Sequence, residues 1–128
     1  MIIFFGCTND DKSDCSDMAC TEVFKTITVS IKNSNGNPIA LDRFEVTIFD
    51  SGTDITRNVN ETEYELMKQN GVYPLFGDEN SEEYENKELK IIFKGFIDSQ
   101  EIVNSNYNVG ADCCHVFLID GNTELIID

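Results

Sequence analysis

One cluster in this sequence has residue types that could catalyse a reaction or bind a metal: two adjacent cysteines followed by a histidine. They are Cys113, Cys114 and His115, in the stretch ADCCHV, and His115 is the chain's one histidine. Thiol and imidazole groups can form a nucleophile with its general base or a zinc site. The two cysteines can instead form disulfide bonds. These roles need different partners and geometry, so the elements around the cluster decide between them.

The residues around this cluster predict a strand over 113–119, joined by a hairpin across 120–122 to a last strand over 123–128. Neighbouring side chains on a strand point to opposite faces, and Cys113 and His115 would stand about 6.6 Å apart along one face. A nucleophile and its base must lie within hydrogen-bond reach. We therefore expect no catalytic residues and no enzymatic activity.

A metal site is the alternative interpretation of the same residues. Enough soft ligands for zinc would come from Cys113, Cys114 and His115 together with Cys15 and Cys20. However, C-x4-C followed by C-C-H is not a usual zinc spacing, and adjacent ligands on a strand diverge. The stretch DGNTE, residues 120–124, lacks the glycine and the distal glutamate of a calcium-binding EF-hand loop. We therefore expect no cofactor.

The N-terminus contains a fifth cysteine in a distinctive setting. A short apolar run and Gly6 precede Cys7, which resembles the end of a bacterial lipobox, where the cysteine becomes lipidated. The following stretch TNDDKSD is similar to the acidic export signal of surface-exposed lipoproteins in Bacteroidota-type bacteria. The resemblance implies a lipid anchor on Cys7 and a location at the outer membrane, exposed on the cell surface. We interpret residues 1–6 as the remnant of a signal peptide and residues 7–20 as an acidic tether.

Assigning Cys7 to lipid leaves an even set of four cysteines, which favours two disulfide bonds. Adjacent Cα atoms are 3.8 Å apart, below the usual disulfide minimum of about 4.4 Å, so Cys113 and Cys114 do not bond each other. Each is expected to bond Cys15 or Cys20, and the sequence leaves both pairings open. Either pairing closes loops of roughly 100 residues, worth up to about 4–5 kcal/mol. We call these two disulfide bonds the staple. His115 is then a surface or hydrogen-bonded residue beside it.

Residues 21–128 carry the pattern of a single β domain. Apolar residues recur at every second position over 27–31, 44–48 and 89–93, which is typical of half-buried strands. Turn residues separate about seven such strands, and long amphipathic helices are absent from the pattern. The sequence therefore predicts an all-β fold, an antiparallel immunoglobulin-like sandwich.

Three further segments have specific expectations. Residues 60–71 favour a short helix or an irregular turn, because Asn60 and Glu63 resemble a capping box and Gly71 can end a helix. Pro74 suits an edge strand. The acidic run 78–88 is expected to be a solvated loop.

The order of these elements is similar to carboxypeptidase-regulatory-like domains, which are transthyretin-like β-sandwiches. The matching positions are a turn glycine and proline, a G-x-Y motif and a glycine–aromatic pair: Gly36 and Pro38, Gly71 and Tyr73, and Gly95 and Phe96. The resemblance covers roughly residues 25–103. It implies an accessory, non-catalytic role.

Charge narrows the choice of partners. The chain carries 24 acidic and 9 basic residues, a formal net charge of −15. This balance excludes nucleic acid, which needs clustered Lys and Arg. We expect a membrane-anchored, non-catalytic module that binds a protein partner in a cell-envelope complex. Carbohydrate recognition is an alternative, for which the available aromatic residues are Tyr64, Tyr73, Phe76, Tyr84 and Tyr107.

Overall fold

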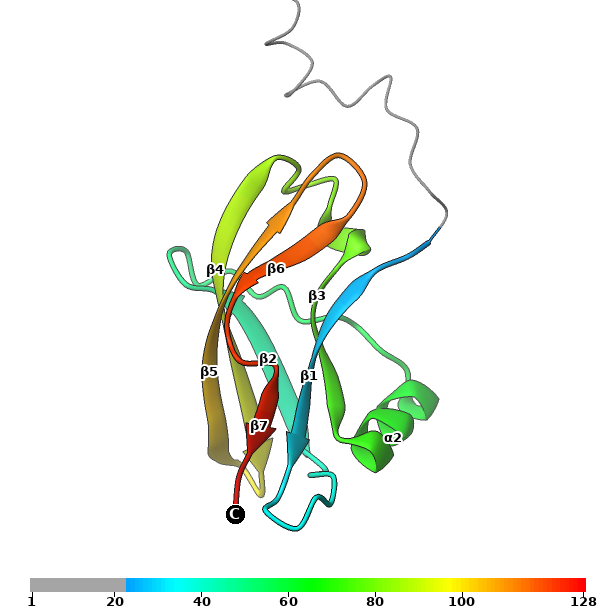
Figure 1. Ribbon diagram of the computed structural model, residues 1–128. Helices are drawn as coiled ribbons and strands as arrows, with labels where there is room; N and C mark the ends of the chain where they lie inside the picture. The colour runs from blue at the N-terminus through cyan, green and yellow to red at the C-terminus, as the bar shows by residue number, and fades with distance from the viewer. Residues whose placement is uncertain (1–22) are drawn as a thin grey trace, which may run out of the picture.

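Two β-sheets packed face to face make up the part of the chain that the computed structural model describes, residues 23–128 (Figure 1). The predictions for the first 22 residues lie outside the described residues. These are the signal-peptide remnant, the tether, the lipid on Cys7, and Cys15 and Cys20 as disulfide partners. The all-β sandwich of about seven strands is confirmed.

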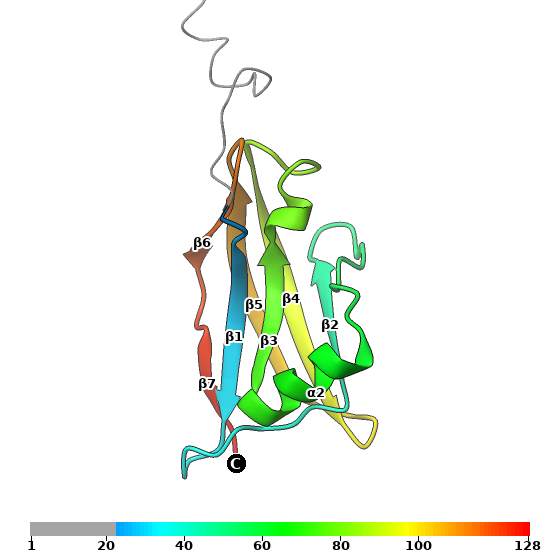
Figure 2. The same ribbon diagram turned by 90° about the vertical axis from the view of Figure 1, so that its right-hand side faces the viewer.

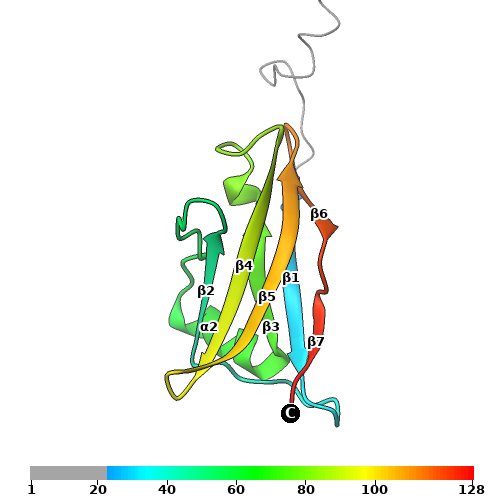
Figure 3. The ribbon, with the colours of Figure 1, turned by 90° about the vertical axis from the view of Figure 1, so that its left-hand side faces the viewer.

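The seven strands divide into a three-stranded and a four-stranded sheet. The first has the order β3-β1-β7 and the second the order β2-β4-β5-β6. The three-stranded sheet faces the viewer in Figure 2 and the four-stranded sheet in Figure 3. The strands are β1 (Thr26–Lys32), β2 (Arg43–Ile48), β3 (Val72–Gly77), β4 (Lys87–Ile97), β5 (Gln100–Ala111), β6 (Val116–Asp120) and β7 (Glu124–Ile126).

The core lies between the sheets and follows the predicted alternation. Val29 of β1, Val46 of β2 and Phe93 of β4 are fully buried. The alternate positions of these strands are at least partly exposed and, apart from Ile92 and Phe96 of β4, polar. Burial of these apolar side chains is the main contribution to the stability of such a fold. Three of the predicted inward positions, at strand ends, are only partly buried: Ile27, Ile48 and Leu89.

Tyr73 links the core to the segment between β1 and β2. Its side chain is fully buried. Its hydroxyl donates to the carbonyl of Ile39 at 2.7 Å and accepts from the amide of Leu41 at 2.8 Å. A buried hydroxyl that lacked these partners would be destabilising, so the two bonds fix the crossing from one sheet to the other at this tyrosine.

The predicted short helix is present as α2 (Glu61–Asn70). Asn60 and Glu63 form the expected capping box, and Gly71 ends the helix in the left-handed conformation with φ 66°. β3 starts at the next residue and is an edge strand, as expected from Pro74.

The predicted hairpin at the C-terminal end of the sequence is wrong. β6 pairs antiparallel with β5, whereas β7 pairs parallel with β1 in the other sheet. Residues 121–123 cross between the sheets, and the hydroxyl of Tyr107 donates to the carbonyl of Asn122 at 2.6 Å. A contact from another strand therefore sets the course of this segment, which a turn motif alone could not indicate.

Candidate functional site

The cysteine–histidine cluster lies in the turn between β5 and β6, not on a strand as predicted. The Asp112 carboxylate accepts hydrogen bonds from the amides of Cys114 and His115 at 2.8 and 2.9 Å. The Asp112 amide in turn donates to the His115 carbonyl at 3.0 Å. An aspartate that bonds backbone two and three residues ahead favours a turn over a strand. The expectation that the cysteines point to opposite faces of a strand therefore does not apply.

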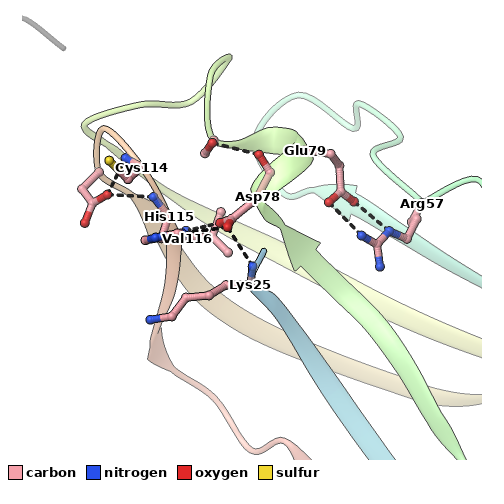
Figure 4. Close-up of polar contacts among 9 residues, drawn as sticks. Lys25, Arg57, Asp78, Glu79, Cys114, His115 and Val116 are labelled. Atoms are coloured by element: carbon pink, nitrogen blue, oxygen red, sulfur yellow. Dashed lines mark hydrogen bonds and ion pairs between the residues drawn. The ribbon is translucent and has the colours of Figure 1, made fainter. Parts of the chain in front are cut away.

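Asp78, at the end of β3, joins this turn to the start of β1 (Figure 4). Its Oδ2 accepts from the Lys25 amide at 2.7 Å and lies 2.7 Å from Nδ1 of His115. Its Oδ1 accepts from the Val116 amide at 2.9 Å. The Asp78 amide also donates to the Lys25 carbonyl at 2.9 Å. We call Asp78, Lys25, His115 and Val116 the Asp78 clamp.

The environment of the Asp78 side chain favours the ionised carboxylate. Burial by itself raises the pKa of Asp78, but the hydrogen bonds from Lys25, His115 and Val116 outweigh it and lower that pKa below its ordinary value. The side chain of Asp78 is 8% exposed and that of His115 is 19% exposed. A largely buried carboxylate with several donors is therefore held in one geometry.

The clamp connects both sheets at one end of the sandwich. Lys25 immediately precedes β1, Asp78 follows β3, and Val116 begins β6. Lys25 and Asp78 thus flank strands of the three-stranded sheet, and Val116 belongs to the four-stranded sheet. Next to the clamp, Glu79 forms an ion pair with Arg57 at 3.1 Å, which ties the same end to the segment before α2.

Sequence reasoning missed Asp78 because nothing local distinguishes it. It begins the acidic run 78–88 that was expected to be solvated, and its partners are 37 to 53 residues away along the chain. The solvated-loop prediction is therefore wrong at Asp78. It is also wrong at Tyr84, which packs against Phe76 with ring centroids 6.1 Å apart.

The described part of the chain offers little for the metal alternative. Within residues 23–128, no three His, Cys, Asp or Glu side chains are grouped so that they could hold a metal ion. The DGNTE stretch forms the crossing to β7, where the Glu124 amide donates to the Asn122 side chain at 3.0 Å.

The aromatic residues considered for carbohydrate binding are mostly packed in the interior. Tyr73, Phe76 and Tyr107 are 0%, 2% and 1% exposed, so they cannot form a stacking platform. Tyr64 and Tyr84 are half-buried. The Tyr64 hydroxyl donates to the Leu41 carbonyl at 2.6 Å, and burial raises the pKa of Tyr64 to about 12.

A shallow hollow of about 300 Å³ lies beside Tyr64, between β2 and the start of α2. Both arginines of the chain contribute to its lining. Their charged heads are engaged elsewhere, because Arg43 forms an ion pair with Glu45 and stacks over Phe96, and Arg57 pairs with Glu79. The hollow therefore presents no unpaired arginine to a ligand.

Comparison of the chain with protein-family models, curated proteins and solved structures finds no match. Among residues 23–128, no helix has the length and apolar character needed to cross a membrane.

Proposed function

We propose that this protein is a non-catalytic lipoprotein, anchored at the bacterial outer membrane through Cys7, that serves as a binding or structural module of a cell-envelope complex. The observation that carries the proposal is the Asp78 clamp. In such a module the lipid-bearing tether would enter the folded domain just ahead of Lys25. The clamp fixes the chain at Lys25, where the domain begins, to the turn that holds Cys113 and Cys114.

The same geometry supports the two disulfide bonds. Cys20 precedes Lys25 by five residues, which can span at most about 17 Å. Lys25 and His115 both contact the Asp78 carboxylate, so the turn lies within that reach. Cys15 and Cys20 are therefore proposed to bond Cys113 and Cys114, and both pairings remain open.

The disulfide bonds bear directly on catalysis. An Asp–His pair such as Asp78 and His115 can orient a general base, and a reduced cysteine beside it would be a nucleophile. A sulfur held in a disulfide bond cannot act as the attacking thiolate. The staple and a cysteine enzyme are thus mutually exclusive, and the even set of four cysteines favours the staple.

Membrane fractionation tests the anchor. The protein would be expressed from its full reading frame in a bacterium that processes lipoproteins, as wild type and as Cys7→Ala. We expect the wild type in the membrane fraction, accessible to protease on intact cells, and Cys7→Ala in the soluble fraction. Thr8→Ala, the neighbouring control, should remain with the membrane. A wild type that is soluble, or a Cys7→Ala protein that stays in the membrane, contradicts the proposal.

A further inference from the structure

β6 is an edge strand that exposes three consecutive apolar residues. Phe117, Leu118 and Ile119 are 42%, 38% and 46% exposed. An exposed edge offers unpaired backbone groups to any other strand, so proteins usually protect it with charges, proline, bulges or a covering segment. In β6 the one charged residue, Asp120, stands at the end of the strand.

The other three sheet edges in residues 23–128 carry such protection. The edge of β2 is covered by residues 53–56, since Ile48 donates to Thr53 and Ile55 donates to Val46, each at 2.8 Å. β3 contains Pro74, beside an irregularity in its pairing with β1. β7 is three residues long and begins with Glu124. The pairing of β6 with β5 is also irregular, between Asn108 and Val109. What distinguishes β6 from the other three edges is its run of three exposed apolar residues.

The backbone of β6 shows which groups face outward. The amide of Val116 points away from β5, because it donates to Oδ1 of Asp78. Because backbone groups alternate along a strand, the amide and carbonyl of Leu118 point away from β5 as the Val116 amide does. Asp78 therefore occupies the position of a neighbouring strand at Val116, and among residues 23–128 no further strand pairs with the outer edge of β6.

The side chain of Leu118 faces the same side of the sheet as the core but remains exposed. Leu118 lies on the same face of β6 as Val116, which is 2% exposed and belongs to the core. The adjacent β7 pairs with β1 only from Ser30 to Lys32. The views from both sides show β6 and β7 one above the other along a single edge of the sandwich (Figures 2 and 3). One added strand beside β6 would cover Leu118.

We propose that the outer edge of β6 binds an extended segment of a partner protein, which adds a strand to the four-stranded sheet. The proposal rests on the function proposed above and identifies the surface through which the module would bind. Backbone bonds to Leu118 supply affinity, and apolar side chains of the partner cover Leu118 and the Phe117–Ile119 face.

Charge selects the occupant of this edge. A partner strand that interleaves apolar residues with Lys or Arg is attracted by a protein with a formal net charge of −15. A second copy would bring the same negative charge and be repelled. Residues 8–17 of this chain contain four aspartates and one lysine, so they are a poor match for the same reason.

Peptide binding to the purified full chain tests the proposal. The probe is a synthetic nine-residue peptide that alternates lysine with valine and isoleucine. One matched peptide replaces lysine with glutamate, and another carries N-methylated backbone amides and cannot extend the sheet. We expect the lysine peptide to bind at least tenfold tighter than either. It should also protect the Leu118 amide from hydrogen exchange.

Two leucine-to-lysine variants locate the site. Leu118→Lys should weaken the binding of the lysine peptide at least tenfold. Leu66→Lys adds the same charge at an exposed leucine of α2, 53% exposed, and should change binding less than twofold. Because Leu118 lies beside the core residue Val116, its substitution could also affect folding. The exchange protection of the Leu118 amide in the wild type provides a measurement that does not depend on the variant's folding.

Several outcomes overturn the proposal. Equal binding of the N-methylated peptide and its parent would indicate electrostatic adsorption only. The proposed site is contradicted if Leu118→Lys and Leu66→Lys lose equal affinity for the lysine peptide, or if the wild type does not bind this peptide. A wild-type dimer in sedimentation that Leu118→Lys dissociates would assign the edge to a second copy. None of these results depends on Cys7, so a failure here is separate from a failure of the membrane anchor.

Discussion

Asp78 shows how one side chain can organise the end of a sandwich. Its two carboxylate oxygens contact Lys25, His115 and Val116, which belong to two segments that are far apart along the chain. A carboxylate accepts with both oxygens, whereas a carboxamide presents one oxygen and one donor group. No other residue type of similar size can replace these contacts.

Asp78→Asn should therefore destabilise the protein at about pH 7. The amide nitrogen would face a backbone donor, and the loss is expected to be about 1–3 kcal/mol in the free energy of unfolding. Because folding lowers the pKa of Asp78, the stabilisation is complete above the unfolded pKa of about 3.9 and is lost as the pH falls through the folded value. The difference between wild type and variant should thus shrink in urea unfolding at about pH 2.5.

The exposed Asp50 provides the control for this substitution. Asp50→Asn should change the free energy of unfolding by less than about 0.5 kcal/mol at either pH. A deficit in Asp78→Asn that is the same at both pH values would contradict the role of the ionised carboxylate.

At the scale of residues, the sequence identified where the unusual chemistry is but not its local geometry. The Cys113–His115 cluster was recognised from residue types alone. The strand predicted there is a turn, because Asp112 bonds the backbone that follows it. Asp78 could not be predicted, since its role depends on partners far away along the chain.

At the scale of elements, the junction between α2 and β3 depends on the absence of a side chain at Gly71. Its φ is 66°, and a Cβ placed there would lie 2.6 Å from the Ile31 carbonyl oxygen and 2.9 Å from Cβ of Pro38. The helix end is thus pressed against β1 and the turn that follows β1. The same junction positions Tyr73 in the core.

Gly71→Ala should accordingly lower the free energy of unfolding by more than the left-handed backbone conformation of Gly71 alone explains. Gly52 is a matched control, because its φ is 73° and a Cβ added there would have no atom within 4 Å. Gly52→Ala should lower the free energy of unfolding by about 1–2 kcal/mol, and Gly71→Ala by roughly 1–3 kcal/mol more because of the steric overlap. Chemical denaturation of both variants measures the difference, and equal losses would show that the close packing relaxes at little cost.

Most elements were predictable because their signals are local. Alternation located β1, β2 and β4, and Asn60 with Glu63 indicated the start of α2. The pairing of β7 was not predictable in this way. Three residues carry no information about whether their partner is β6 or β1, and the Tyr107 contact that decides it comes from another strand.

At the scale of the whole molecule, the proposed disulfide bonds would join the start of the domain to the β5–β6 turn. The intact mass of the native protein should be lower by about four hydrogens than after reduction. Reduction should also lower the free energy of unfolding, by up to about 4–5 kcal/mol for the loop of roughly 100 residues that the first bond closes, while the second bond adds less. Four alkylatable thiols in the native protein would exclude the staple and reopen both the zinc and the cysteine-enzyme alternatives.

The central position of β1 has a mechanical consequence. β1 is bonded to β3 on one side and to β7 on the other. A pull on the chain ahead of Lys25 acts along the axis of β1, across the direction of these bonds. The hydrogen bonds of β1 with β3 and β7 are then loaded in shear. They must therefore break together instead of one after another from an end. The domain should therefore resist extraction of β1 by tension better than it resists peeling of β6.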